Sequence, residues 1–222
     1  MSGWFHVVDP GVASTIQDRG RPGLAHLGIP ASGAVDRRLA ALVNRLTGNS
    51  EDAAVVETCG NLTIRAGTAL LVATSAELAP VSMAPGDVLR VTPDERRLWH
   101  YVAISGGIDV PPVLGSRAAD TLSGLGPPPL RPADRLRTGG GAAMAIATDQ
   151  APLAELVDVA RVSAGPRIEW FAPGVYDVLT SVEWTVTASS RVGVRLAGAP
   201  LERRVTTELP SEGLVPGAIQ VP

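Results

Sequence analysis

The chain has 222 residues, a formal net charge of −3 and 45% hydrophobic residues, enough for one large domain or two small ones with a sizeable core. Its pI near 5.6 and its 4% of aromatic residues exclude the basic, base-stacking surface of a nucleic-acid-binding protein. The single cysteine, Cys59, excludes an intrachain disulfide framework, and the sequence has neither a signal peptide nor an apolar run of about 18 residues. We therefore expect a cytoplasmic protein that binds neither nucleic acid nor membranes.

Short apolar segments alternate with glycines and prolines along the whole chain, which predicts many short strands joined by turns. The predicted strands are residues 4–8, 62–65, 69–74, 88–91, 101–105, 142–147, 168–171, 184–188 and 192–196. The fold class that follows is mainly β, with one or two short helices.

One helix is predicted by apolar side chains at the i, i+3, i+4, i+7 spacing, namely Leu39, Leu42, Val43 and Leu46. Ser32 is the predicted cap at its start, and Asp36 complements the positive end of the helix dipole. Gly48 is a natural stop, and residues 51–57 are a candidate for a second short helix.

A change of composition suggests two domains. A glycine-rich turn at 138–141 precedes a mixed segment at 149–166, so we predict an N-terminal β-rich domain at 1–150 and a second domain at 151–222. About four strands are predicted in the second domain, which is few for an independent barrel.

The first motif places polar residues between glycines ahead of the predicted helix: Asp9-Pro10-Gly11, Gln17-Asp18-Arg19-Gly20-Arg21-Pro22-Gly23 and Pro30-Ala31-Ser32-Gly33-Ala34-Val35-Asp36. A helix start attracts a carboxylate, phosphate or carbamate, and Arg19 or Arg21 could add a bidentate clamp. In the alternative interpretation the segment is a structural loop in which Ser32 and Asp36 only serve the helix.

The second motif runs through Ser105-Gly106-Gly107-Ile108-Asp109 to Gly115-Ser116-Arg117-Ala118-Ala119-Asp120. Its Gly-Gly turn is not a Walker sequence, because no Gly-Lys-Ser/Thr follows. Ser116, Arg117 and Asp120 could form a polar trio that binds a ligand, or a salt bridge on a surface loop.

The third motif carries the arginines of the C-terminal part. Arg191 and Arg195 are four residues apart, so on one regular strand they face the same side and suit an anionic substrate. Glu212 could pair with one of them or act as a general base, and Gln220 could hydrogen-bond an amide. The alternative is an exposed strand face with solvated arginines.

Other chemistries have weaker support. His6, His26 and His100 lack metal-ligand spacing, so no metal site is predicted. Cys59 is expected to be a small buried residue rather than a nucleophile, and no Gly-x-Ser-x-Gly sequence occurs.

Taken together, the motifs resemble the allophanate hydrolase subunit 2 family, also described as the biotin-dependent carboxyltransferase A/B domain. Its members include the subunit-C protein of 5-oxoprolinase and part of urea amidolyase. Besides the three motifs, the matching phrases include Asn44-x-x-x-Gly48-Asn49, Arg191-Val192-Gly193-x-Arg195-Leu196-x-Gly198, Ser211-Glu212-Gly213 and Gly217-Ala218-Ile219-Gln220-Val221-Pro222.

The resemblance implies a cyclophilin-like β-barrel that pairs with a subunit-1 or subunit-B relative. It implies a hydrolase of cyclic or linear amides that, within a multi-subunit complex, uses ATP to open 5-oxoproline to glutamate. One alternative is the carboxyltransferase half of a biotin-dependent urea carboxylase, with biotin carried by a partner. Another is a regulatory binding subunit that antagonises a kinase inhibitor.

For the small amide substrate we predict Arg195, Glu212 and Asp36 as catalytic residues. The predicted substrate-binding residues are Arg21, Ser32, Arg117, Arg191 and Gln220. Relatives continue beyond the phrase that ends at Pro222 into a Thr-Thr-Gly-Gly-Tyr segment. We therefore expect the second barrel to be incomplete here, because the chain is a fragment or because another chain supplies the closing strands.

Overall fold

The computed structural model describes residues 2–92, 97–140, 151–152 and 159–221. The chain forms two compact units, Met1–Leu156 and Val157–Pro222. The predicted mainly β fold with one or two short helices is confirmed, whereas the predicted barrel is not seen: the described strands form three sheets, none of which closes. Among the described residues no helix is long and apolar enough to cross a membrane.

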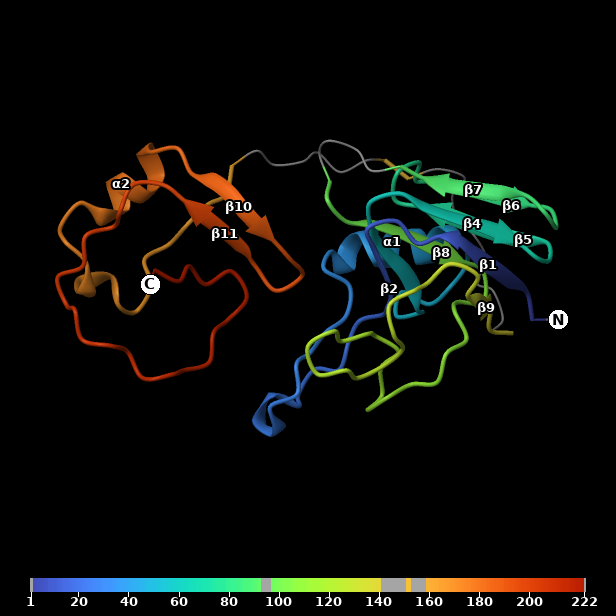
Figure 1. Ribbon diagram of the computed structural model, residues 1–222, viewed down its shortest axis with the longest axis horizontal. Coiled ribbons are helices and arrows are strands. Elements are labelled where there is room, and N and C mark those ends of the chain that lie inside the picture. Colours follow the sequence, from blue (N-terminus) through green and yellow to red (C-terminus); the bar gives the residue numbers. More distant parts are fainter. Residues whose placement is uncertain (1, 93–96, 141–150, 153–158, 222) are drawn as a thin grey trace. The chain divides into compact units, whose positions relative to one another are not determined.

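The first unit contains two antiparallel sheets (Figure 1). The five-stranded sheet has the order β2-β3-β8-β5-β6, with β2 (Ala13–Gln17), β3 (Val55–Cys59), β8 (His100–Ile104), β5 (Leu70–Thr74) and β6 (Pro80–Met83). The four-stranded sheet has the order β7-β4-β1-β9, with β7 (Val88–Val91), β4 (Leu62–Ala66), β1 (Trp4–Asp9) and β9 (Arg135–Arg137).

Two hydrophobic clusters make this unit a three-layer structure. The larger cluster joins side chains of both sheets, including Phe5 of β1, Ile64 of β4 and Val102 of β8. The smaller cluster joins the other face of the five-stranded sheet to the helix, including Tyr101 and Ala103 of β8. Successive residues of a strand point to opposite faces, so β8, buried at every position, contributes to both clusters.

Helix α1 (Arg37–Leu46) covers the five-stranded sheet, and its apolar stripe packs on it as the spacing predicts. The predicted cap at Ser32 is wrong. Asp36 is the N-cap, and its Oδ1 accepts a hydrogen bond of 2.9 Å from the Leu39 N–H. The helix ends at Thr47, and the Gly48 N–H returns to the Arg45 carbonyl oxygen at a positive φ of 71°.

The second unit consists of the hairpin of β10 (Thr185–Ser189) and β11 (Val194–Ala197), with helix α2 (Val175–Ser181) and the short 3₁₀ helix η2 (Ile168–Trp170). Among the described residues of 159–221 none is buried, in contrast to the first unit. A two-stranded sheet has too little area to enclose a core of its own.

Several predicted elements differ from the structure. The predicted helix at 51–57 is wrong, because residues 51–53 form a turn and β3 follows. The predicted strand at 168–171 is wrong, since η2 occupies it. The predicted strand at 142–147 lies outside the described residues. Strands β2, β3, β6 and β9, helix α2 and the 3₁₀ helix η1 (Ala25–Leu27) were not predicted.

Candidate ligand-binding site

Two long segments, residues 18–36 and 108–130, extend from the same end of the first unit (Figure 1). We call them the first and second arm. The carboxylate of Asp18 joins them. Its Oδ1 accepts hydrogen bonds from Gly20 N in its own arm and from Ser116 Oγ in the second, and its Oδ2 accepts one from Arg117 N, all within 2.7 Å. Asp18 is therefore fully committed to holding the arms together.

Arg21 makes the second connection between the arms and is only 2% exposed. Its guanidinium donates to the carbonyl oxygens of Val113 and Ala118 and to Ser32 Oγ, at 3.3, 2.6 and 3.1 Å. The Ser32 hydroxyl in turn donates to Asp120 Oδ2 at 2.6 Å. A buried cation thus reaches its counter-ion through one hydroxyl group.

The Asp120 carboxyl group responds to this network. Partial burial raises its pKa, but hydrogen bonds from Ser32 Oγ and the backbone N–H groups of Ser123 and Leu122 outweigh burial and hold the pKa below its usual value. A carboxyl group with a depressed pKa in the folded state stabilises the fold above its unfolded-state pKa, and that contribution is lost as pH falls through the folded-state pKa. Asp120 therefore ties the arms together best as a carboxylate.

Glycine is required where the first arm doubles back on itself. A Cβ atom on Gly20 would lie 2.3 Å from the Ala31 carbonyl oxygen, and one on Gly33 would lie 2.7 Å from Gly20 N. Both glycines have a φ between 80° and 90°, a region that residues with side chains rarely adopt. The first motif thus encodes a close backbone crossing.

A buried tyrosine and glutamate hold the start of α1 on the sheet. Glu57 Oε2 accepts hydrogen bonds from Val35 N at 2.8 Å and from the Tyr101 hydroxyl at 3.0 Å. The same hydroxyl accepts a bond of 2.7 Å from Asp36 N. Burial, followed by the charge of Glu57, raises the pKa of the Tyr101 phenol above its ordinary value, so the phenol stays protonated.

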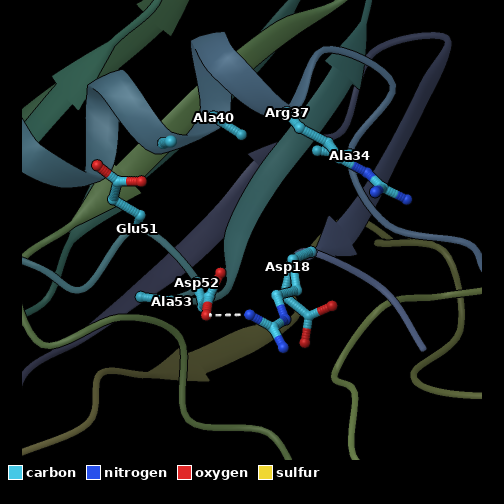
Figure 2. Close-up of a pocket in the computed structure, with 9 residues that line it drawn as sticks. Asp18, Ala34, Arg37, Ala40, Glu51, Asp52 and Ala53 are labelled. Atoms are coloured by element: carbon cyan, nitrogen blue, oxygen red, sulfur yellow. Dashed lines mark hydrogen bonds and ion pairs between the residues drawn. The ribbon is translucent and has the colours of Figure 1, made fainter. Parts of the chain in front are cut away.

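A pocket of about 250 Å³ lies where α1, the first arm and the turn before β3 meet. Its lining is apolar where four alanines meet and charged around them: Ala34, Ala40, Ala41, Ala53, Asp18, Arg19, Arg37, Glu51 and Asp52. Figure 2 shows Ala34 and Ala40 on one side of the hollow, Ala53 and Asp52 on the other, and the dashed ion pair to Asp52 beside it. That pair joins Arg19 Nη1 to Asp52 Oδ2 at 2.9 Å.

The size of the pocket suits a small ligand. Its volume of about 250 Å³ lies below the roughly 300–1,000 Å³ of sites for drug-sized ligands. A molecule about the size of an amino acid fits this volume.

The Gly106-Gly107 turn has a structural role. Gly106 N donates to Asn49 Oδ1 at 2.8 Å, while Asn49 Nδ2 donates to Asn44 Oδ1 and to the Ile104 carbonyl oxygen. A Cβ on Gly106 would lie 2.1 Å from the Gly139 carbonyl oxygen. The turn is packed against protein backbone, which accounts for the Asn44-x-x-x-Gly48-Asn49 phrase.

The predicted site residues of the first unit occupy the network described above. Arg21, Ser32 and Arg117 join the two arms, and Asp36 caps α1. Ser116, Arg117 and Asp120 share the second arm, as predicted, and each also bonds to the first arm: Ser116 and Asp120 through their side chains and Arg117 through its backbone N–H. Arg117 also donates from Nε to the Val110 carbonyl oxygen at 2.8 Å.

The predicted site residues of the second unit are spread out. Arg195 is exposed on β11, whereas Arg191 lies in the turn before it, so the prediction of one shared strand is wrong. Glu212 pairs with Arg167 through two bonds of 2.6 Å, not with Arg191 or Arg195 as proposed. Gln220 is exposed.

Sequence reasoning missed three residues of the pocket, namely Arg37, Glu51 and Asp52. No spacing signal marks them, because they converge only when the turn before β3 packs beside α1. Among the described residues no group of three or more His, Cys, Asp or Glu side chains could hold a metal ion.

Residues 27–222 match the family described as "Carboxyltransferase domain, subdomain A and B". The chain belongs to this family. It is 31% identical, over 97% of its length, to the subunit-C protein of 5-oxoprolinase from Escherichia coli (strain K12), and it spans 76% of that protein. It is 34% identical, over 55% of its length, to urea amidolyase of Lachancea kluyveri, of which it spans 8%.

Two solved structures share the fold. The crystal structure of TTHA0988 matches with a TM-score of 0.78 and 28% identity, over 90% of this chain and 43% of that chain. The urea carboxylase of Kluyveromyces lactis matches with a TM-score of 0.74 and 27% identity, over 90% of this chain and 21% of that chain. The family predicted from the motifs is therefore confirmed.

Proposed function

We propose that the chain is a subunit of an ATP-dependent amidohydrolase of the 5-oxoprolinase type, which opens 5-oxoproline to glutamate together with partner subunits. The observation that carries the proposal is the match to the subunit-C protein of 5-oxoprolinase from Escherichia coli (strain K12), which extends over 97% of this chain. A second subunit-C protein of 5-oxoprolinase, from Haemophilus influenzae, is 26% identical over the same share of the chain.

Opening a lactam with ATP requires both a site that stabilises the reacting amide and a site that binds the nucleotide. Opening a lactam adds water across a stable amide bond, so an oxyanion develops that preorganised donors must stabilise. ATP supplies the driving force. We propose that a partner of the same family, of the subunit-1 or subunit-B type, completes the assembly and that ATP binds elsewhere in the complex. The localisation that suits this work is the cytoplasm.

The predicted residues of the second unit fit this proposal only in the complex. Arg195, Gln220 and the Arg167–Glu212 pair are solvent-accessible in the isolated chain. We propose that Arg195 and Glu212 act against substrate when a partner surface excludes water around them, because charged groups stabilise a transition state strongly only in such a setting.

The alternative is the carboxyltransferase half of a biotin-dependent urea carboxylase. Its support is the likeness to urea amidolyase and to the Kluyveromyces lactis urea carboxylase. The sequence contains no lysine, since all its basic side chains are arginines and histidines. Biotin is carried on a lysine, so a partner would have to bring it.

One experiment separates the two functions. The chain is co-expressed and purified with its subunit-B relative and with a lactamase-like partner protein, and ATP hydrolysis is measured with 5-oxoproline or urea. The proposed function predicts ATP hydrolysis that depends on 5-oxoproline and yields glutamate. Urea-dependent turnover that needs a biotin carboxylase and a biotinylated partner would favour the alternative.

A further inference from the structure

An exposed ion pair, Arg19–Asp52, lies beside the alanine-lined pocket. The two side chains are 65% and 54% exposed, so water screens their attraction. Exposed pairs of this kind contribute little to the stability of a fold. A ligand that offers each partner an equivalent group can therefore separate them at little energetic cost.

The two charges and the alanines define the ligand's chemistry. A carboxylate can take the place of Asp52 on the Arg19 guanidinium, whose planar fork suits bidentate binding. Once released, Asp52 can accept a hydrogen bond from an N–H group. The apolar surface of Ala34, Ala40 and Ala53 suits a short run of methylene groups.

From this geometry we infer that the pocket binds a small carboxylate with a neighbouring N–H group. The ligand separates Arg19 from Asp52: its carboxylate pairs with Arg19, and its N–H group donates a hydrogen bond to Asp52. The class includes α-amino acids and cyclic amides of amino acids. Choosing 5-oxoproline as the first probe rests on the proposed function, because its ring carries a carboxylate next to a lactam N–H.

Arg37 adds a second cation to the rim. It follows the N-cap of α1 and makes no ion pair or hydrogen bond to another described residue through its side chain. The acidic residues of the lining are otherwise engaged: Asp18 holds the arms and Glu51 pairs with Arg45 at 2.6 Å. An incoming carboxylate therefore pairs with Arg19, because Figure 2 shows the Arg37 side chain extending away from the Arg19–Asp52 ion pair.

The test measures binding by calorimetry to the chain co-purified with its partner protein, without ATP. The probes are 5-oxoproline, glutamate and the lactone analogue of 5-oxoproline, in which oxygen replaces the N–H. We expect Arg19→Gln to weaken 5-oxoproline binding by at least about tenfold, since it removes a charge-assisted contact. Ala41→Leu, which fills the pocket with a larger residue that is still a strong helix former, should do the same.

A matched control is available in Arg38, which is exposed on α1 and does not line the pocket. Arg38→Gln removes the same charge close to the same end of the helix. It should leave binding within about twofold, because water and salt screen an exposed charge that does not contact the ligand.

The lactone analogue tests the role of Asp52. It should bind the wild-type protein at least about tenfold more weakly than 5-oxoproline, because it cannot donate to the carboxylate. In Asp52→Ala this difference should vanish. Equal binding of lactam and lactone to the wild-type protein, or wild-type affinity in both Arg19→Gln and Ala41→Leu, would overturn the inference.

The outcomes also separate the inference from the proposed function. A complex that hydrolyses 5-oxoproline with an unchanged KM in Ala41→Leu supports the function and rejects the pocket. A protein that binds 5-oxoproline through Arg19, but whose complex shows no 5-oxoproline-dependent ATP hydrolysis, supports the pocket and rejects the function.

Discussion

Replacing Arg21 with methionine should loosen both arms of the first unit. The change removes three hydrogen bonds from a side chain that is 2% exposed and leaves the oxygens of Val113, Ala118 and Ser32 without that donor. At about 1 kcal/mol net for each bond, we expect the free energy of unfolding to fall by about 3 kcal/mol. For a chain of this length that corresponds to a decrease in Tm of roughly 6–12 °C.

The matched control is Arg19→Met, which removes the same charge at a position two residues earlier in the chain. Arg19 makes an exposed ion pair with Asp52, so its loss should lower the free energy of unfolding by no more than about 1 kcal/mol. Thermal melts followed by circular dichroism compare the two variants. Hydrogen exchange adds a local measure, because only Arg21→Met should increase exchange at Ala118 and in the second arm. Equal melting temperatures and equal exchange in the two variants would refute the assigned role of Arg21.

Three further outcomes are expected. Gly20→Ala should lower the free energy of unfolding by at least about 2 kcal/mol more than Gly23→Ala does, as measured by thermal melts. Both glycines have a positive φ, but only a Cβ on Gly20 would clash with backbone. Equal effects would show that the backbone does not cross closely at Gly20. Protection of the arms from hydrogen exchange should decline as pH falls through the depressed pKa of Asp120, and Asp120→Asn should weaken that dependence; an identical pH profile in the variant would contradict it. The chain purified alone should self-associate in light scattering, since no described residue of 159–221 is buried, and its subunit-B relative should suppress this; a monodisperse monomer would count against it.

The sequence predicts the strands that are apolar and misses those that are polar but buried. β8 could be predicted because four of its five residues are apolar, and the structure buries all five. β2 does not, although four of its five residues are buried. Its polar side chains find partners inside the fold, such as Ser14 Oγ with Thr58 Oγ1 at 2.8 Å. Such pairing depends on tertiary contacts, so local hydropathy cannot reveal it.

The sequence pointed to many residues of the candidate site but not to the way they are arranged. The first two motifs contain the residues of the network that joins the arms, yet Asp18 and Arg117 are 99 positions apart and nothing local indicates that they bond. Asp52 was hidden because its segment was assigned to a helix. In the second unit, Glu212 has two candidate arginine partners nearby in sequence, but it pairs with Arg167, 45 positions away.

The glycine-rich phrases also show what the sequence cannot predict. Gly20 and Gly106 could be identified as positions that need conformational freedom. Whether the space beside such a glycine holds a ligand or backbone depends on the fold, and in both cases backbone fills it. The sequence therefore identifies these glycines as special positions, but only the fold shows that protein backbone, and not a ligand, lies beside them.

The most direct test of the central claim is reconstitution of 5-oxoproline hydrolysis with and without this chain. Purified partner proteins are combined with 5-oxoproline and ATP, and glutamate and ADP are quantified. We expect glutamate formation to require this chain and ATP to be consumed in proportion to the glutamate formed. Full activity of the partners without the chain, or no 5-oxoproline-dependent ATP hydrolysis in the complete assembly, would contradict it.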